Sequence, residues 1–311
     1  MHRRITIQGD GAAVSALAAD LAPLDGVIGL SHLRGSSVKP PGDVLQVDVL
    51  NRHADEVLRR VGPAQANLER PVVVVLGQST ALLDRRRSHM IETDADEALW
   101  EEMESDLRNH GRLSTNYLVL MALGGLIAAC GFVLDPVSQA IAFVGASIIA
   151  PGFEPVAKLA QGLVVGARRL CGHALLSIAV GYAVLFTAAL LMMAILGLIH
   201  PGHPHELVMR QPILTVFAGF AIAPLATTAA AAIAGVMMVV SLRDLYVVGP
   251  LMVLVAVPGV ALAGTAVAIG EPALALRVLS RVGLDLLLIV VLGGGVFYWK
   301  QRRFHRRRPL G

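Results

Sequence analysis

Charged residues, aromatic residues and cysteine are all scarce in this chain of 311 residues. Only 16% of the residues are charged, against about 25% in soluble globular proteins, and 55% are hydrophobic. The mean hydropathy of +0.66 therefore excludes an ordinary soluble domain. Aromatic residues make up 5%, and no aromatic platform accompanies the arginines, so we expect no nucleic-acid partner. The two cysteines, Cys130 and Cys171, are too few for a disulfide framework or a zinc site.

The hydrophobic residues are concentrated in the second part of the chain. Residues 1–115 hold most of the acids, whereas 116–299 are nearly all apolar. A membrane-spanning helix needs roughly 20 apolar residues. Six segments are long enough: 116–134, 137–166, 172–199, 212–240, 247–270 and 280–299. The sequence therefore predicts an α-helical polytopic domain with six spans in the cell membrane, and the polar start Met1–Ile5 predicts no cleavable signal peptide.

The first 77 residues alternate strand and helix patterns. We expect strands at Ile5–Ile7, Val27–Leu33, Val44–Leu50 and Val72–Leu76, and helices at Ala12–Leu21 and Ala54–Val61. The order βαββαβ is the ferredoxin-like pattern, so residues 1–77 are predicted to be a soluble α+β domain. This stretch has no phosphate loop and no cofactor fingerprint, so we expect a regulatory or assembly domain and no cofactor.

Residues 78–115 are predicted to connect the two parts. A polar linker covers 78–91, and an amphipathic helix is expected to start at Thr93, with Asp96 completing a capping box. Leu99, Met103 and Leu107 form its apolar stripe.

The distribution of Lys and Arg predicts that both termini are cytoplasmic. The expected inner loops hold Arg168, Arg169 and Arg243, whereas Arg210, Arg277 and Arg281 fall outside. The tail 300–311 adds six cations: Lys300, Arg302, Arg303, Arg306, Arg307 and Arg308. Each basic residue beside a membrane is attracted to anionic lipid by about 1 kcal/mol, so we expect the tail to bind such lipids.

The second apolar segment is interrupted by Pro151 and Pro155, and it carries Glu154 and Lys158. A broken helix and an ionisable group are both costly in hydrocarbon, so this stretch is the candidate substrate or ion site. We expect Glu154 to bind a proton or cation, while Lys158 neutralises or gates it. Two alternatives stay open: an ion pair that only fixes helix packing, and a shallow site from which Lys158 reaches the headgroups.

Other polar and small residues are expected to line the same site. Ser147, Gln161, Thr227 and Thr228 are the polar candidates, with Pro224 predicted to kink the fourth segment. Gly152 and Gly259 would let backbone carbonyls approach a ligand. Alternatively, the hydroxyl groups only bond to the preceding helical turn.

Two segments resemble each other, at 145–162 and 249–264. Each has a Gly, an apolar run, a Pro (Pro258 in the second), a Leu-Ala pair and a Gly. They would be the middle spans of two three-span halves, which suggests the 3+3 inverted repeat of secondary transporters. The alternative is two unrelated helices kinked by proline. Small-residue faces at Gly124-Gly125 and Gly293–Gly295 predict a homo-oligomer.

The loop between the halves contains His200, His203, His205 and Glu206, which are candidate ligands for zinc or copper. The prolines stiffen this loop, and histidine is common at membrane edges. The sequence therefore favours no metal site.

Several of these residues carry a family resemblance. They are Tyr117–Leu120, Gly145–Pro151 with Pro155, and Gly249 with Pro258. At these positions the chain resembles the hydrophobic membrane family named domain of unknown function 389, over about 1–299. The resemblance implies an architecture but no activity. Glu154 and Gly259 depart from the family pattern, which commonly has a small residue and a second proline there.

The function predicted from the sequence is membrane transport of an unidentified substrate, coupled to a proton or cation. The spans contain no Ser–His pair, no paired aspartates and no metal-ligand spacing, so we expect no enzyme activity. The alternative is a membrane scaffold or sensor that transports nothing and acts through its ferredoxin-like domain.

Overall fold

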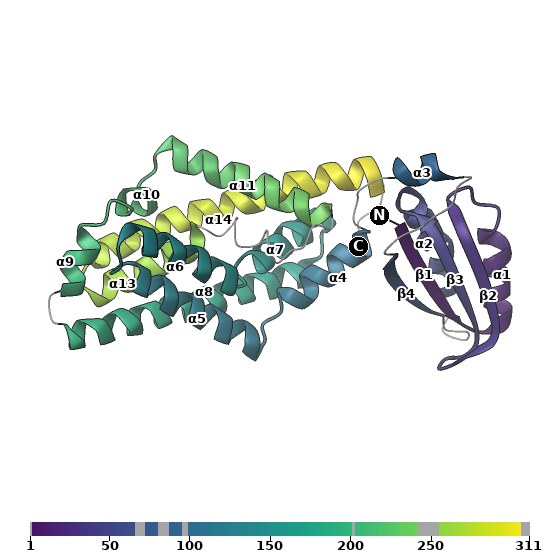
Figure 1. Cartoon of the computed structure of the whole chain (residues 1–311), viewed down its shortest axis with the longest axis horizontal. Coiled ribbons are helices and arrows are strands. Elements are labelled where there is room, and N and C mark those ends of the chain that lie inside the picture. Colours follow the sequence, from purple (N-terminus) through teal and green to yellow (C-terminus); the bar gives the residue numbers. More distant parts are fainter. Residues whose placement is uncertain are drawn as a thin grey trace. The chain divides into compact units, whose positions relative to one another are not determined.

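A computed structural model describes residues 2–65, 72–79, 87–94, 99–200, 203–241 and 255–305. It divides the chain into two compact units, Met1–Glu102 and Met103–Gly311. Figure 1 labels the helices and strands of both units.

The N-terminal unit is built on a four-stranded antiparallel sheet. Its strands are β1 (His2–Gly9), β2 (Val27–Val38), β3 (Pro41–Leu50) and β4 (Val73–Ser79), in the spatial order β2-β3-β1-β4. Helix α1 (Gly11–Leu21) follows β1, and α2 (Asn51–Gln65) follows β3. The predicted βαββαβ order is therefore the observed one.

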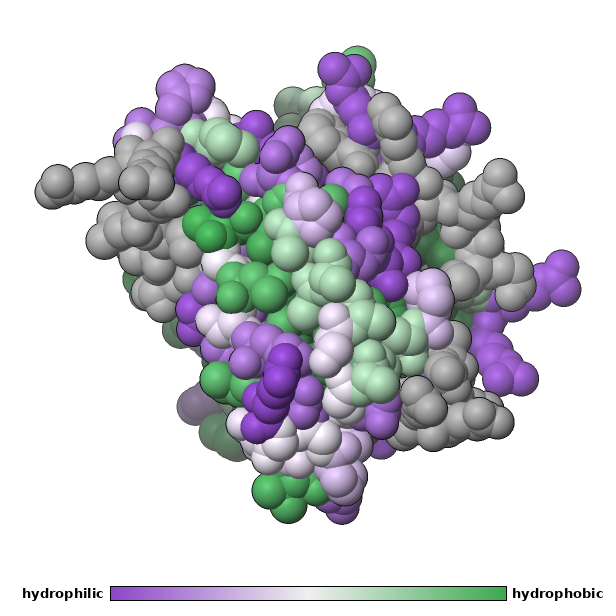
Figure 2. All heavy atoms as spheres, turned by 90° about the vertical axis from the view of Figure 1, so that its right-hand side faces the viewer, coloured by the Kyte–Doolittle hydropathy of each residue, from purple (hydrophilic) through white to green (hydrophobic). Residues whose placement is uncertain are grey.

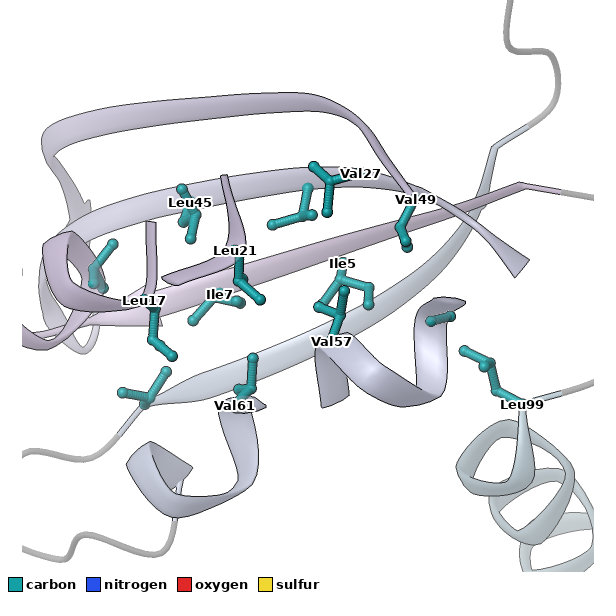
Figure 3. Close-up of a cluster of buried hydrophobic side chains, with 14 residues drawn as sticks. Ile5, Ile7, Leu17, Leu21, Val27, Leu45, Val49, Val57, Val61 and Leu99 are labelled. Atoms are coloured by element: carbon teal, nitrogen blue, oxygen red, sulfur yellow. The ribbon is translucent and has the colours of Figure 1, made fainter. Parts of the chain in front are cut away.

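The core of this unit lies between the sheet and the two helices (Figure 3). Ile5 and Ile7 point to one face of β1 because side chains alternate along a strand. They meet Leu21 of α1 and Val57 of α2, and all four side chains are fully buried. The helical spacing and the strand alternation thus place their apolar residues in the same core layer.

The β2–β3 hairpin is longer than the sequence pattern predicts, because Asp43 holds its far end together. The Asp43 carboxylate accepts a hydrogen bond from the Gly35 amide at 2.8 Å and lies 2.7 Å from Nε2 of His32. These contacts stabilise the charged carboxylate and hold the pKa of Asp43 below its usual range. Gly35 supplies the positive φ that this bend requires, at +62°.

The predicted helix start at Thr93 is wrong. Residues Ser88–Glu92 form a short helix, α3, and the Thr93 hydroxyl donates to the carbonyl of His89 at its end. The Asp94 carboxylate accepts from the Asn51 amide at 2.7 Å, so it serves the start of α2 instead. The connecting helix α4 spans Trp100–His110, and Asp96 lies outside the described residues.

The second unit is helical. Its helices are α5 (Thr115–Gly131), α6 (Pro136–Ile149), α7 (Phe153–Val165), α8 (Arg168–Ile199), α9 (His203–Met209), α10 (Leu214–Ala218), α11 (Ile222–Val240), α13 (Ala256–Ala268) and α14 (Pro272–Lys300). A short π-helix, Gln301–His305, continues α14. Helix α8 packs against α5, α7 and α13, and α14 packs against α7, α11 and α13.

Some of these helices can cross a membrane. Among the described residues, α8 and α11 are long and apolar enough, and α6 with α7 makes a third candidate, bent by 50°. Helices α5 and α13 are apolar but shorter. The large exposed side chains, such as Ile141, Leu198 and Leu276, suit contact with lipid. These features are compatible with membrane association. On the face of the N-terminal unit shown in Figure 2, hydrophilic residues surround a central area of hydrophobic ones.

Candidate functional site

The second apolar segment is broken between α6 and α7, over Ala150–Gly152. Pro151 has no N–H to continue the helix, and α7 leaves at 50° to α6. The Gly152 carbonyl accepts a hydrogen bond from the Tyr182 hydroxyl of α8 at 3.3 Å. Pro155 lies in the first turn of α7, where a missing N–H costs little. The break is therefore made by Pro151 and supported by Tyr182.

This break lies level with the middle of its neighbours. A Cβ on Gly124, halfway along α5, would be only 2.7 Å from the Cβ of Ala150. The next residue, Gly125, packs equally closely on the Leu185 carbonyl of α8. Both glycines allow backbones to approach, and they fix the break at half the length of α5.

Lys158 lies nearer the end of α5. The residue is only 4% exposed, and its ammonium group donates a hydrogen bond to the carbonyl of Gly111 at 3.4 Å. The Ser177 hydroxyl of α8 donates to the same oxygen at 3.2 Å. Because Gly111 precedes α5, Lys158 lies level with the first turn of that helix, away from its middle.

Glu154 occupies the first turn of α7, where a carboxylate is favoured by the helix dipole. Gly111 packs on its main chain, since a Cβ there would be 3.3 Å from the Glu154 carbonyl oxygen. The carboxyl group interacts electrostatically with the Tyr117 and Tyr182 hydroxyls. Tyr117 donates to the carbonyl of Ser177 at 2.9 Å, so α5, α7 and α8 share one polar network.

In the described part of the second unit, three buried side chains have polar atoms with no hydrogen-bond partner. They are the hydroxyls of Ser147 and Thr265 and both amide atoms of Gln161, each in a residue at most 1% exposed. Ser147 and Gln161 were candidates from the sequence. Thr265 on α13 was missed, because a lone threonine among small apolar residues gives no pattern.

The family model for the domain of unknown function DUF389 matches residues 148–291. Residues 148–291 are similar to this family. The match takes in the break, Glu154, Lys158 and Pro155, whereas Tyr117–Leu120 lie before it. Neither the search of curated proteins nor the search of solved structures gave a match.

The fourth apolar segment is broken upstream of the predicted kink. The interruption lies at Gly219–Ala221, between α10 and α11, and Pro224 sits harmlessly in the first turn of α11. Arg281 of α14 donates to the Gly219 carbonyl at 3.0 Å and pairs with Asp285 at 2.9 Å. This pair is fully buried, and it ties α14 to the second break.

The hydroxyls of Thr227 and Thr228 bond to the preceding turn of α11. They donate to the carbonyls of Ala223 and Pro224, at 3.0 and 3.2 Å. Thr227 is exposed and Thr228 is buried. Both hydroxyls are thus engaged locally.

Pro258 and Gly259 lie in the first turn of α13, whose residues 256–266 are all buried. A Cβ on Gly259 would be 2.7 Å from a Val282 methyl group, so this glycine brings α13 against α14. Gly249 and the predicted first half of the fifth segment lie outside the described residues.

The candidate metal ligands take separate partners. The rings of His200 and His203 are 6.3 Å apart, His205 lies 3.4 Å from Glu271, and Glu206 pairs with Arg210 at 3.7 Å. Within the described part of the chain, no three His, Cys, Asp or Glu residues are grouped to hold a metal ion.

Proposed function

We propose that the chain is a polytopic membrane transport protein whose translocation site is the α6–α7 break. The observation that carries this proposal is an interrupted helix at half the length of its neighbours, with an acid and a base within two turns. Interrupted helices at that depth are tolerated where they face protein or a water-filled cavity. An ionisable residue in such a position marks an ion or substrate path by default. Glu154 is the group proposed to take up a proton or cation.

An inverted repeat is part of the proposal, with halves α5–α8 and α10–α14. Helices α7 and α13 both have 13 residues. Each has a proline in third place, Pro155 or Pro258, and a Leu-Ala pair in seventh and eighth place. Each is followed by a glycine with positive φ, Gly166 at +75° or Gly270 at +86°, and then by a long helix. These shared features support the repeat over the alternative of two unrelated helices kinked by proline.

A second correspondence involves the long helices. The tenth residue of α8 is Ser177, which donates to the Gly111 carbonyl just ahead of α5. The tenth residue of α14 is Arg281, which donates to the Gly219 carbonyl just ahead of α11. In Figure 1, α8 ends near α9 at the left, whereas α14 begins at the left and runs to the right. Opposite directions for equivalent helices are what an inverted repeat requires.

We further propose six spans with both termini in the cytoplasm of the cell. The spans would be α5, α6–α7, α8, α10–α11, the segment that ends in α13, and α14. Arg281, an apparent exception to the charge rule, is fully buried and paired with Asp285, so it should not count as a loop charge. Anionic lipid at the basic tail remains part of the proposal. Arg306–Arg308 lie outside the described residues.

The test is proton flux through the full chain in liposomes that contain a pH-sensitive dye, driven by a potassium diffusion potential. We expect Glu154→Gln to reduce the flux by about tenfold or more, because amides do not titrate and positioned proton carriers contribute roughly that much. Glu206→Gln, an exposed acid of α9, is the matched control and should keep the wild-type rate.

Equal flux through wild-type and Glu154→Gln protein would remove the role given to Glu154. Flux no greater than in empty liposomes would instead favour the scaffold or sensor alternative. In that case, deleting residues 1–77 should abolish the cellular effect of the protein.

A further inference from the structure

The Gln161 side chain of α7 is buried without partners for its polar atoms. The residue is only 1% exposed, and in the described part of the chain neither its amide oxygen nor its amide nitrogen has a hydrogen-bond partner. A primary amide offers two donor hydrogens and two acceptor lone pairs, so several hydrogen bonds are missing at once. Buried groups of this kind are satisfied by ordered water or by a ligand. The position therefore requires a small molecule that both donates and accepts.

Gln161 belongs to a polar stripe along α7. Glu154, Lys158 and Gln161 are spaced i, i+4 and i+7, which places them on one face of the helix. Lys158 shows where this face points, because its ammonium group donates to the Gly111 carbonyl ahead of α5. Gln161 lies one turn beyond Lys158, and the exposed Gly166 ends the helix. These three residues, which we call the α7 stripe, lead from the α7–α8 turn to the break.

The second half of the proposed repeat has no such stripe. When the prolines of α7 and α13 are matched, the stripe positions correspond to Val257, Ala261 and Gly264, all of them buried. Val257 packs on the break, since a Cβ on Gly152 would be 3.4 Å from its methyl group. A Cβ on Gly264 would be only 2.4 Å from the Phe186 carbonyl oxygen of α8. These positions offer no polar side chain to hold water, so the polar stripe serves one side of the domain only.

The surroundings of the α7 stripe favour a proton over a metal cation. Cations such as Ca²⁺ are held by several oxygen ligands. The carbonyls beside the stripe already have donors: Gly111 accepts from Lys158 and Ser177, and Gly152 accepts from Tyr182. The Lys158 ammonium group would also repel a metal cation that passes it. A proton needs no such set of ligands, because water molecules and titrating side chains can carry it.

Glu154 is the only acid on α7 and can therefore receive the proton. The Tyr117 and Tyr182 hydroxyls interact electrostatically with it, and Arg108 of α4 interacts in the same way with Lys158. Helix α14, which packs against α7, has no charged side chain between Asp285 and Lys300. The basic residues of α8 lie in its first two turns and are exposed.

From these observations we propose that protons reach Glu154 along the α7 stripe from the side of the α7–α8 turn, and that Gln161 binds water on this path. The inference rests on the proposed transport function and names the proton as the ion taken up. Gln161 is about 10 Å along the helix axis from Glu154, a distance that a short chain of waters and Lys158 can bridge. Uptake converts the Glu154 carboxylate into the neutral acid, and the proton comes from bulk water through this chain.

The first experiment measures whether water reaches Gln161. Gln161→Cys is compared with Thr265→Cys in the full chain without Cys130 and Cys171, in nanodiscs that leave both membrane faces open to a small charged methanethiosulfonate. We expect Gln161→Cys to react about tenfold faster or more, because the reactive thiolate forms where water solvates it. Thr265 is the matched control, since it is equally buried and unpartnered in the described structure but lies on α13.

Proton flux in liposomes with a pH-sensitive dye supplies the second readout. Gln161→Met keeps the length of the side chain and removes its polar atoms, so we expect a roughly tenfold lower flux. Thr265→Val removes only a hydroxyl group and should keep the wild-type rate.

Equal reactivity of the two cysteine variants would overturn the proposal, as would wild-type flux through Gln161→Met. If the Gln161 variants do not fold, a structure of the unaltered protein at a resolution that shows water decides the matter, and no water at the Gln161 amide would overturn it. Flux that depends on Glu154 but not on Gln161 would leave the transport function standing and remove the path. A reactive Gln161→Cys in a protein without any flux would support the water path and remove the transport function.

Discussion

Two buried cationic side chains, one in each half of the proposed repeat, donate hydrogen bonds to backbone carbonyls. Lys158 bonds to the carbonyl of Gly111, and Arg281 bonds to the carbonyl of Gly219. Each carbonyl precedes a long helix of its half, and the Gly111 carbonyl also accepts a hydrogen bond from the Ser177 hydroxyl. Part of what makes Lys158 look functional in the sequence is therefore explained by its structural contact. Glu154 and the neighbouring tyrosines carry the remaining argument for transport.

The residue-level pH prediction concerns Asp43 in the β2–β3 hairpin. Its folded-state pKa is lowered by the Gly35 amide and by His32, so its contribution to stability is present above the unfolded pKa. Asp43→Asn should lower the unfolding temperature of the N-terminal unit at pH values above about 5, where the carboxylate is charged in both states. Below about pH 4 the difference from wild type should shrink, as protonation removes the advantage of the native carboxylate.

Circular dichroism of thermal unfolding at several pH values would measure this difference. A gap between the two proteins that persists unchanged to low pH would contradict the assignment. Asp48→Asn is a control on the other end of β3, where the partner is the exposed Arg4.

At the scale of elements, the space around each glycine shows whether its side of the helix packs against a neighbouring helix or is exposed. Gly125→Ala should destabilise the unit by about 1–3 kcal/mol, since its Cβ would meet the Leu185 carbonyl backbone. A Cβ at Gly295 would have no atom within 4 Å, so Gly295→Ala should be neutral or stabilise α14 by up to about 1 kcal/mol. Denaturation in mixed micelles, followed by circular dichroism, compares the two. Equal losses of stability would mean that α5 and α8 are not in close contact.

The same glycines revise the expectation of an oligomer. Gly124, Gly125 and Gly293 pack against Ala150, Leu185 and Val236 of the same chain. They therefore cannot be used as faces for a second copy. A homo-oligomer stays a prediction. Of the glycines just discussed, only Gly295 is exposed and could still contact a second copy.

The sequence was most informative about elements with a strict period. The alternation of Ile5 and Ile7 and the helical spacing of Leu17 and Leu21 specified the N-terminal unit nearly completely. Positions set by tertiary contacts were not predictable. Asp94 moved the start of α4 by binding the start of α2, and Arg281 supports a break three residues before Pro224.

For the candidate site, local signals located Pro151, Glu154 and Lys158, but not their partners. Gly111, Ser177 and Tyr182 are distant in sequence and engage through carbonyls and hydroxyls, which leave no composition signal. The contact between Gly152 and Val257 required the spatial relation of both halves. The sequence was enough to locate the break, whereas the residues around it could be identified only from the folded structure.

At the scale of the whole molecule, the inverted repeat predicts that the α7–α8 turn and the α13–α14 turn open to opposite sides of the membrane. The test replaces Ala167 or Ala273 by a single cysteine in a protein from which Cys130 and Cys171 have been removed. A maleimide that cannot cross membranes then labels only a cysteine that faces the side to which it is added. We expect labelling of Ala273→Cys in intact cells, and of Ala167→Cys only after permeabilisation. Labelling of both from the same side would rule out the inversion.

Helix α13 has a consequence for biosynthesis. Residues 256–266 of this helix are all buried, so this stretch is covered by neighbouring helices and not by lipid. Its walls are α8, made before it, and α14, made after it. The α13 helix therefore gains its complete set of contacts only after α14 has been synthesised, and we expect a nascent chain cut before Pro272 to leave one face of this helix uncovered.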